Sequence, residues 1–113
     1  AGALGVVGVM FEEGDANPEL EKIWANAPAK AGEEKNAADV SLDLGKLLPA
    51  DQRYYRFMGS LTTPPCSEGV NWHMMQRPIT ASKAQIDAFR TFFAMNARPI
   101  QPANDRLVVK DTK

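Results

Sequence analysis

The stretch Ser60-Leu61-Thr62-Thr63-Pro64-Pro65-Cys66 is the most informative part of this 113-residue chain. Two adjacent hydroxyl side chains precede two prolines, whose fixed φ angles restrict the backbone. The flanking segments are rich in residues that favour β-strands: 54–59 (YYRFMG) before it and 70–75 (VNWHMM) after it. The pattern therefore predicts two strands joined by a rigid loop that presents both threonines at its mouth.

Residues 54–72 closely resemble the part of α-class carbonic anhydrases that holds the gatekeeper threonine of that family. The resemblance rests on the run Tyr-x-Phe-x-Gly-Ser-Leu-Thr-Thr-Pro-Pro-Cys and on Trp72, six residues after Cys66. Residues 96–102 resemble a second motif of the family, Asn-x-Arg-Pro-x-Gln-Pro, with Arg106 at the expected offset and Ala97 where members have an aromatic residue. Residues 1–113 thus resemble the C-terminal part of a single domain of a bacterial α-class carbonic anhydrase.

The resemblance implies a mainly β fold, with a large twisted, mostly antiparallel sheet and short peripheral helices, incomplete in this chain. It implies an enzyme, a carbonate dehydratase, that hydrates carbon dioxide reversibly to bicarbonate and a proton by zinc-bound hydroxide. In that family three histidines hold the zinc, and all precede the matched region. This chain has one histidine, His73. We therefore expect zinc as the cofactor, its ligands outside this chain, and no tight zinc binding or activity from this chain alone.

The resemblance also assigns roles to individual residues. Thr62 matches the catalytic threonine that accepts a hydrogen bond from the attacking hydroxide and donates to a glutamate outside this chain; a hydroxyl can do both. Thr63 matches a residue beside bicarbonate. Four residues match the apolar wall that holds carbon dioxide: Leu61, Val6, Val70 and Trp72. From the residues alone, the threonines are turn residues and the apolar side chains are core.

Two further residues of the family pattern are expected to have supporting roles. The backbone carbonyl at Asn96 matches one that hydrogen-bonds a zinc-ligating histidine. The Asn96 side chain and Arg98 are expected to be structural. The Pro64–Pro65 peptide is expected to be cis, as in the family.

Two lone residues with metal-binding or redox chemistry need separate interpretations. Alternation along 68–75 puts Glu68, Val70 and Trp72 on one face and His73 on the other, so His73 with Glu68 and Cys66 does not form a ligand set. His73 is expected to be a packed or surface imidazole. Cys66 is the only cysteine. In the bacterial relatives the cysteine at this place pairs with one near the N-terminus, so Cys66 is a disulfide candidate and indicates a periplasmic or secreted protein.

Local patterns predict the remaining elements. The apolar run 1–11 predicts a central strand. Asn17 followed by proline predicts a helix over 18–27, whose apolar stripe is expected to pack against the sheet. Alternation predicts a strand at 40–44, a capping box at Ser82 predicts a second helix, and 106–110 is expected to be the last strand.

Composition excludes several classes of protein. Thirteen basic and fourteen acidic residues give a formal charge of −1 with no basic stripe, so nucleic acid is not an expected partner. No apolar stretch is long enough to span a bilayer, so a membrane is not expected either. Hydrophobic residues make up 44% of the chain, which is typical of a globular protein.

Three arrangements of the chain remain open at this point. It can be one piece of a nicked or split enzyme, with the N-terminal half as a second chain. It can be a non-catalytic binding or structural module on a carbonic anhydrase scaffold. It can also be an incomplete polypeptide that folds only as a swapped or aggregated assembly, since a strand edge invites pairing. A homodimer also stays open.

Overall fold

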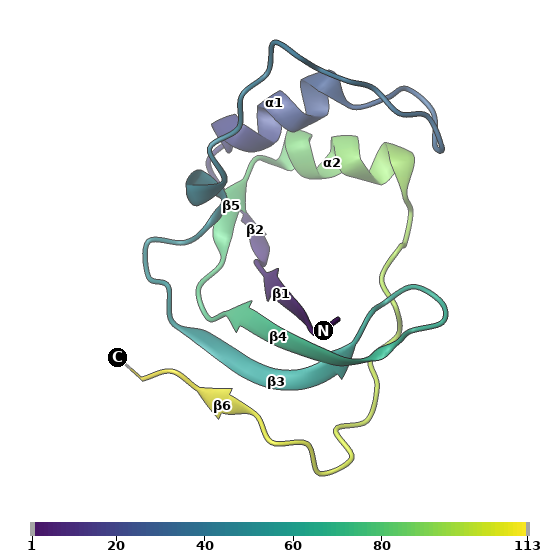
Figure 1. The fold of residues 1–113 in the computed structure, drawn as a ribbon. Coiled ribbons are helices and arrows are strands. Elements are labelled where there is room, and N and C mark those ends of the chain that lie inside the picture. The colour runs from purple at the N-terminus through teal and green to yellow at the C-terminus, as the bar shows by residue number, and fades with distance from the viewer. Residues whose placement is uncertain (1, 113) are drawn as a thin grey trace. The chain divides into compact units, whose positions relative to one another are not determined.

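A computed structural model describes residues 2–112 (Figure 1). The described residues divide into two compact units. Unit 1 comprises 2–10, 49–78 and 96–112, and unit 2 comprises 11–48 and 79–95. No helix in the described part of the chain has the length and apolar character needed to cross a membrane.

Unit 1 is a four-stranded sheet in the order β1-β4-β3-β6. Its strands are β1 (Leu4–Gly8), β3 (Tyr54–Ser60), β4 (Glu68–Met75) and β6 (Val109–Lys110). β3 pairs antiparallel with β4 and β6, whereas β1 runs parallel to β4, so this sheet is mixed. The buried hydrophobic side chains of this unit, Val70 and Met75, both belong to β4.

Two strand predictions, at the N-terminal run and at the last strand, need correction. The N-terminal run does not form one central strand: β1 is an edge strand of its sheet, paired only with β4 among the described residues, and Val7 is 57% exposed. Near-continuous apolar sequence usually marks a strand buried on both faces, which misled the prediction. The run also breaks before Phe11, which starts a strand of unit 2. The last strand covers only Val109–Lys110 of the expected 106–110.

Unit 2 contains two helices and a two-stranded parallel sheet. The helices are α1 (Pro18–Asn26) and α2 (Lys83–Phe92), and the strands are β2 (Phe11–Glu13) and β5 (Ile79–Ala81). Asn17 caps α1 by accepting from the backbone N–H groups of Glu19 and Leu20, as predicted. Ser82 and Gln85 form the predicted capping box of α2.

The two helices pack on each other through aromatic side chains. The rings of Trp24 and Phe89 stack with centroids 5.7 Å apart, and Trp24 Nε1 donates to the Gln85 carbonyl at 2.9 Å. The apolar stripe of α1 therefore contacts α2, and the prediction that it packs on the sheet missed this contact.

No strand forms at the predicted position 40–44. This segment is irregular, and a 3₁₀ helix, η1 (Leu44–Leu47), begins inside it. Asp43 N donates to the buried carboxylate of Glu19 at 3.0 Å, and the Asp43 side chain accepts from Gly45 N. Because these groups bond to a helix and to a neighbouring turn, they are not free for strand pairing.

Candidate functional site

The candidate site is built around the loop that joins β3 to β4. Leu61 N donates to Ser67 O at 2.9 Å, and Cys66 N donates to Thr63 O at 2.8 Å. The Pro64–Pro65 peptide is cis, as predicted, so Thr63–Cys66 is a type VI turn. Thr62 and Thr63 are both exposed. The loop is therefore closed on itself and leaves both threonines accessible.

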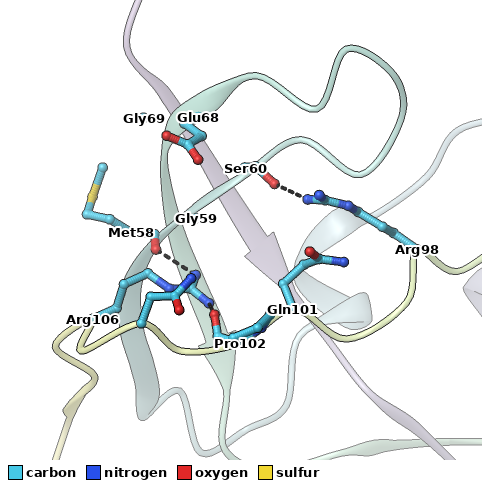
Figure 2. Close-up of a pocket in the computed structure, with 10 residues that line it drawn as sticks. Met58, Gly59, Ser60, Glu68, Gly69, Arg98, Gln101, Pro102 and Arg106 are labelled. Atoms are coloured by element: carbon cyan, nitrogen blue, oxygen red, sulfur yellow. Dashed lines mark hydrogen bonds between the residues drawn. The ribbon is translucent and has the colours of Figure 1, made fainter.

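The base of the loop is fixed at Ser60 by side chains from two other segments. Trp72 Nε1 donates to the Ser60 carbonyl at 3.0 Å. Arg98 Nη1 donates to Ser60 Oγ at 2.7 Å, as Figure 2 shows. Ser60 Oγ in turn donates to the Leu61 carbonyl at 2.9 Å. The structural role predicted for Arg98 is confirmed. The anchoring role of Ser60 was missed, because nothing in the sequence marks a serine that receives a bond from a residue 38 positions away.

The expected apolar wall lies on one face of the unit 1 sheet. Register pairs Val6 with Trp72 and Leu4 with Val70, which puts Val6, Val70 and Trp72 on the same side. Val70 is 1% exposed, and the indole of Trp72 stacks on Phe57 with centroids 6.3 Å apart. Leu61 is half-buried at the start of the loop. The structure thus brings Val6, Val70 and Trp72 together, and their contact with carbon dioxide stays a prediction.

Two glycines whose roles were not predicted, Gly59 and Gly69, shape this region. A Cβ atom on Gly59 would lie 2.9 Å from Trp72 Cδ1, so the absence of a side chain lets the indole lie over β3. Gly69 has a φ of +83°, and the register shifts beside it, between Gly59 and Ser60. Glu68 is therefore paired with Ser60, while Val70 is paired with Gly59.

This bulge corrects the expected faces of β4. One extra residue reverses the alternation, so Glu68 lies on the face opposite Val70 and on the same face as His73. The predicted separation of Glu68 and His73 on opposite faces of β4 is therefore wrong. His73 is half-buried, and its ring packs against Tyr54 with centroids 5.1 Å apart. The expected packed imidazole is confirmed.

The remaining predicted residues lie apart from this wall. Asn96 is exposed at the start of the C-terminal segment of unit 1. Cys66 is a free, half-buried cysteine with a φ of +55° in the described part of the chain. Its partner in a disulfide would have to lie outside this chain, because Cys66 is the only cysteine.

The described residues do not form a metal site. Among residues 2–112, no three His, Cys, Asp or Glu side chains gather closely enough to hold a metal ion. The residues present therefore do not fit zinc by themselves.

The ion pair nearest to β3 in sequence is structural. The side chain of Arg53, and then its backbone N–H, donate to Asp51 and hold the pKa of the Asp51 carboxyl well below its usual range. Arg77 lies 3.7 Å from the same carboxylate. These bonds fix the turn before β3.

A family model described as Eukaryotic-type carbonic anhydrase matches residues 1–112. The chain belongs to this family. A carbonic anhydrase of Klebsiella pneumoniae is 50% identical over 111 residues, and one of Nostoc sp. is 47% identical over 110 residues. These matches cover 96% and 97% of this chain but only 44% and 42% of the relatives, so the chain spans less than half of their length.

Solved structures place the fold in the same family. The α-carbonic anhydrase of Thermovibrio ammonificans, solved with the inhibitor sulfanilamide, matches with a TM-score of 0.87 and 46% identity. The α-carbonic anhydrase of Photobacterium profundum matches with a TM-score of 0.83 and 48% identity. Each covers 92% of this chain, which covers 46% and 48% of those chains. The predicted α-carbonic anhydrase fold is confirmed.

Proposed function

We propose that this chain supplies the threonine loop and the apolar wall of a carbonic anhydrase site that hydrates carbon dioxide reversibly to bicarbonate and a proton. The observation that carries the proposal is the bond from Trp72 Nε1 to the Ser60 carbonyl, which ties the wall to the loop. Membership of the family supplies the reaction. The proposal extends the family's reaction to a chain that spans less than half of its relatives.

Each group has a defined task in this proposal. Val6, Val70 and Trp72 offer carbon dioxide a dry apolar surface, which suits a molecule without charge or strong hydrogen-bonding groups. Thr62 orients the attacking oxygen by accepting and donating at one hydroxyl. As that oxygen forms a bond to the carbon, one C=O π bond of carbon dioxide breaks and its electron pair moves to the carbonyl oxygen. The attacking water gives up one proton, so water and carbon dioxide become bicarbonate and a proton. Thr63 contacts the resulting bicarbonate.

The proposal includes zinc because the family resemblance implies zinc as the cofactor. Because the described residues do not fit a zinc site, the ligands would lie in the remaining portion of the family domain, supplied by another chain or segment. A catalytic zinc ion, when bound, lowers the pKa of a water molecule to about 7. The main-chain carbonyl of Asn96 would orient one of the ligating histidines.

The experiment compares two neighbouring threonines. The chain is mixed with the remaining portion of the Klebsiella pneumoniae relative, and carbon dioxide hydration is measured by stopped flow, with zinc content checked. Thr62→Ala should lower turnover by about 10² to 10³-fold, which is typical for loss of a preorganised polar contact. Thr63→Ala is the matched control and should lose much less. Equal, mild losses in both variants would contradict the role of Thr62.

We further propose that the protein acts in the periplasm or is secreted, with Cys66 in a disulfide to the remaining portion of the domain. The half-buried thiol of Cys66 and the family resemblance support this proposal. Non-reducing electrophoresis of the mixture under oxidising conditions tests it. A covalent product is expected with Cys66 and none with Cys66→Ser.

A further inference from the structure

A polar pocket of about 420 Å³ lies in unit 1, beside the base of the loop. Figure 2 shows its lining residues, which come from the end of β3, the start of β4 and the C-terminal segment. By register, Met58 and Ser60 lie on the face opposite Val70 and Trp72. The pocket is therefore separate from the apolar wall.

One arginine of the pocket is used to build it. All three nitrogens of the Arg106 guanidinium donate to backbone carbonyls: to Ala103 at 2.9 Å, Met58 at 3.0 Å and Pro102 at 3.0 Å. Arg106 thus joins the C-terminal segment to β3, and three of its five N–H groups are used in these bonds.

The other arginine has donors to spare. Arg98 is half-buried and donates through Nη1 to Ser60 Oγ at 2.7 Å. Within residues 2–112, Arg98 Nε and Nη2 donate to no protein group, and no carboxylate forms an ion pair with this guanidinium. The Nε and Nη2 hydrogens form the edge that matches a carboxylate with two parallel bonds. A half-buried guanidinium that makes no ion pair is unfavourable, and a bound anion would relieve that cost.

We propose that this pocket binds a carboxylate-type anion on the Nε and Nη2 edge of Arg98. Two sources have this chemistry: free bicarbonate, and the side chain of an aspartate or glutamate on another polypeptide. Arg98 also holds Ser60 Oγ, and Ser60 is followed directly by Leu61 and Thr62. Occupation of the pocket would therefore stiffen the base of the threonine loop.

The charges of the side chains that line the pocket favour the binding of a single monovalent anion. Arg98 and Arg106 carry two positive charges, and the lining carboxylate is Glu68, which is exposed at the start of β4. Gln101 Nε2 donates to the Pro99 carbonyl at 2.9 Å, so its amide is oriented by the same segment that carries Arg98. The balance is one net positive charge, which a single carboxylate neutralises.

Titration of the whole chain tests the proposal. The Nε–H resonance of Arg98 is followed by nuclear magnetic resonance during additions of sodium bicarbonate and sodium acetate, at constant ionic strength set by chloride. Both salts should shift the resonance to saturation, and chloride alone should not. In Arg98→Lys, which lacks this resonance, the backbone N–H of Ser60 is followed instead, and binding should be about tenfold weaker, because lysine cannot make the two parallel bonds. Arg56→Gln is the control, since Arg56 lies outside this pocket and bonds Asn71 Oδ1, and it should leave the titration unchanged.

A second arm separates the two sources. The chain is mixed with the remaining portion of the Klebsiella pneumoniae relative. If a carboxylate side chain of that polypeptide fills the pocket, acetate no longer shifts Arg98, and Arg98→Lys weakens assembly. If free anion is the ligand, acetate and bicarbonate still bind in the mixture.

Two results together would overturn the proposal. These are shifts with acetate and bicarbonate no larger than those with chloride, and an assembly unaffected by Arg98→Lys. Ser60→Ala tests whether weaker anion binding results from loss of the bond between Arg98 and Ser60 and not from the altered side chain at position 98. It removes the Ser60 hydroxyl that accepts from Arg98 but keeps the guanidinium. This variant should still respond to acetate.

Discussion

Replacement of Gln85 by leucine should destabilise unit 2 more than any surface substitution of the same kind. Gln85 is 4% exposed, and its side chain makes four hydrogen bonds. Oε1 accepts from Asn17 N at 2.9 Å and Ser82 N at 3.1 Å. Nε2 donates to Asn17 O at 2.8 Å and Glu21 Oε2 at 3.0 Å. One amide thus joins the start of α1 to the start of α2.

The magnitude follows from what the change leaves unpaired. A typical hydrogen bond contributes about 0.5–1.5 kcal/mol net, and a buried polar group without a partner costs about 1–3 kcal/mol. Leucine would leave the Asn17 N–H without its partner, would leave the Asn17 carbonyl with the bond from Glu21 N alone, and would remove half of the capping box at Ser82. Burial of the leucine side chain offsets part of the loss. We expect unit 2 to lose about 3–5 kcal/mol of unfolding free energy, by the sum of these contributions.

Urea unfolding followed by far-ultraviolet circular dichroism measures this loss, because both α-helices belong to unit 2. Gln52→Leu is the matched control. Gln52 is exposed and lies in unit 1, so this substitution should change the unfolding free energy of unit 2 little. Gln85→Glu keeps the acceptor atoms but places a carboxylate beside Glu21, so its destabilisation should diminish as pH falls. A loss for Gln85→Leu as small as that for Gln52→Leu would refute the reasoning.

Two further predictions concern a carboxylate and a glycine. Glu19 is 2% exposed, and the Asp43 backbone N–H, together with Lys22, lowers the pKa of its carboxyl, so its contribution to stability should be present at neutral pH and lost as pH falls through the lowered value. Urea midpoints of wild type should therefore fall more steeply with acid than those of Glu19→Gln, and parallel curves would contradict this. Gly59→Ala should destabilise unit 1 by about 1–3 kcal/mol, because the new methyl group would lie 2.9 Å from Trp72 Cδ1. Tryptophan fluorescence during urea unfolding measures the loss, and an unchanged midpoint would show that the indole shifts freely.

The features predicted correctly are those whose causes lie close together in sequence. Asn17 caps α1 by accepting from N–H groups two and three residues ahead, and Ser82 and Gln85 cap α2 within one turn. The cis Pro64–Pro65 peptide was predicted by the resemblance to the family, through a motif that spans only residues 55–66. Such signals are complete within a short window, so the sequence alone suffices to place both helices and the loop.

The features predicted wrongly depend on distant partners or on one backbone angle. The strand expected at 40–44 fails because Asp43 N bonds to Glu19, 24 residues earlier. The face of Glu68 is wrong because the positive φ of Gly69 adds one residue to the alternation. The edge position of β1 depends on its pairing with β4, about 65 residues away in sequence, as partners such as Val6 and Trp72 show. Periodicity within a segment carries none of this information.

Residues of the two motifs that resemble the family hold the base of the threonine loop in place. The loop follows β3, but its base is held by Trp72, 12 residues beyond Ser60, and by Arg98, 38 residues beyond it. Arg106 then ties the C-terminal segment to Met58, 48 residues earlier in the chain. Bringing together segments that lie far apart in sequence costs chain entropy. Several hydrogen bonds at the same loop base together offset that loss. The geometry of Thr62 therefore depends on the C-terminal segment being in place, even though no residue of that segment belongs to the loop itself.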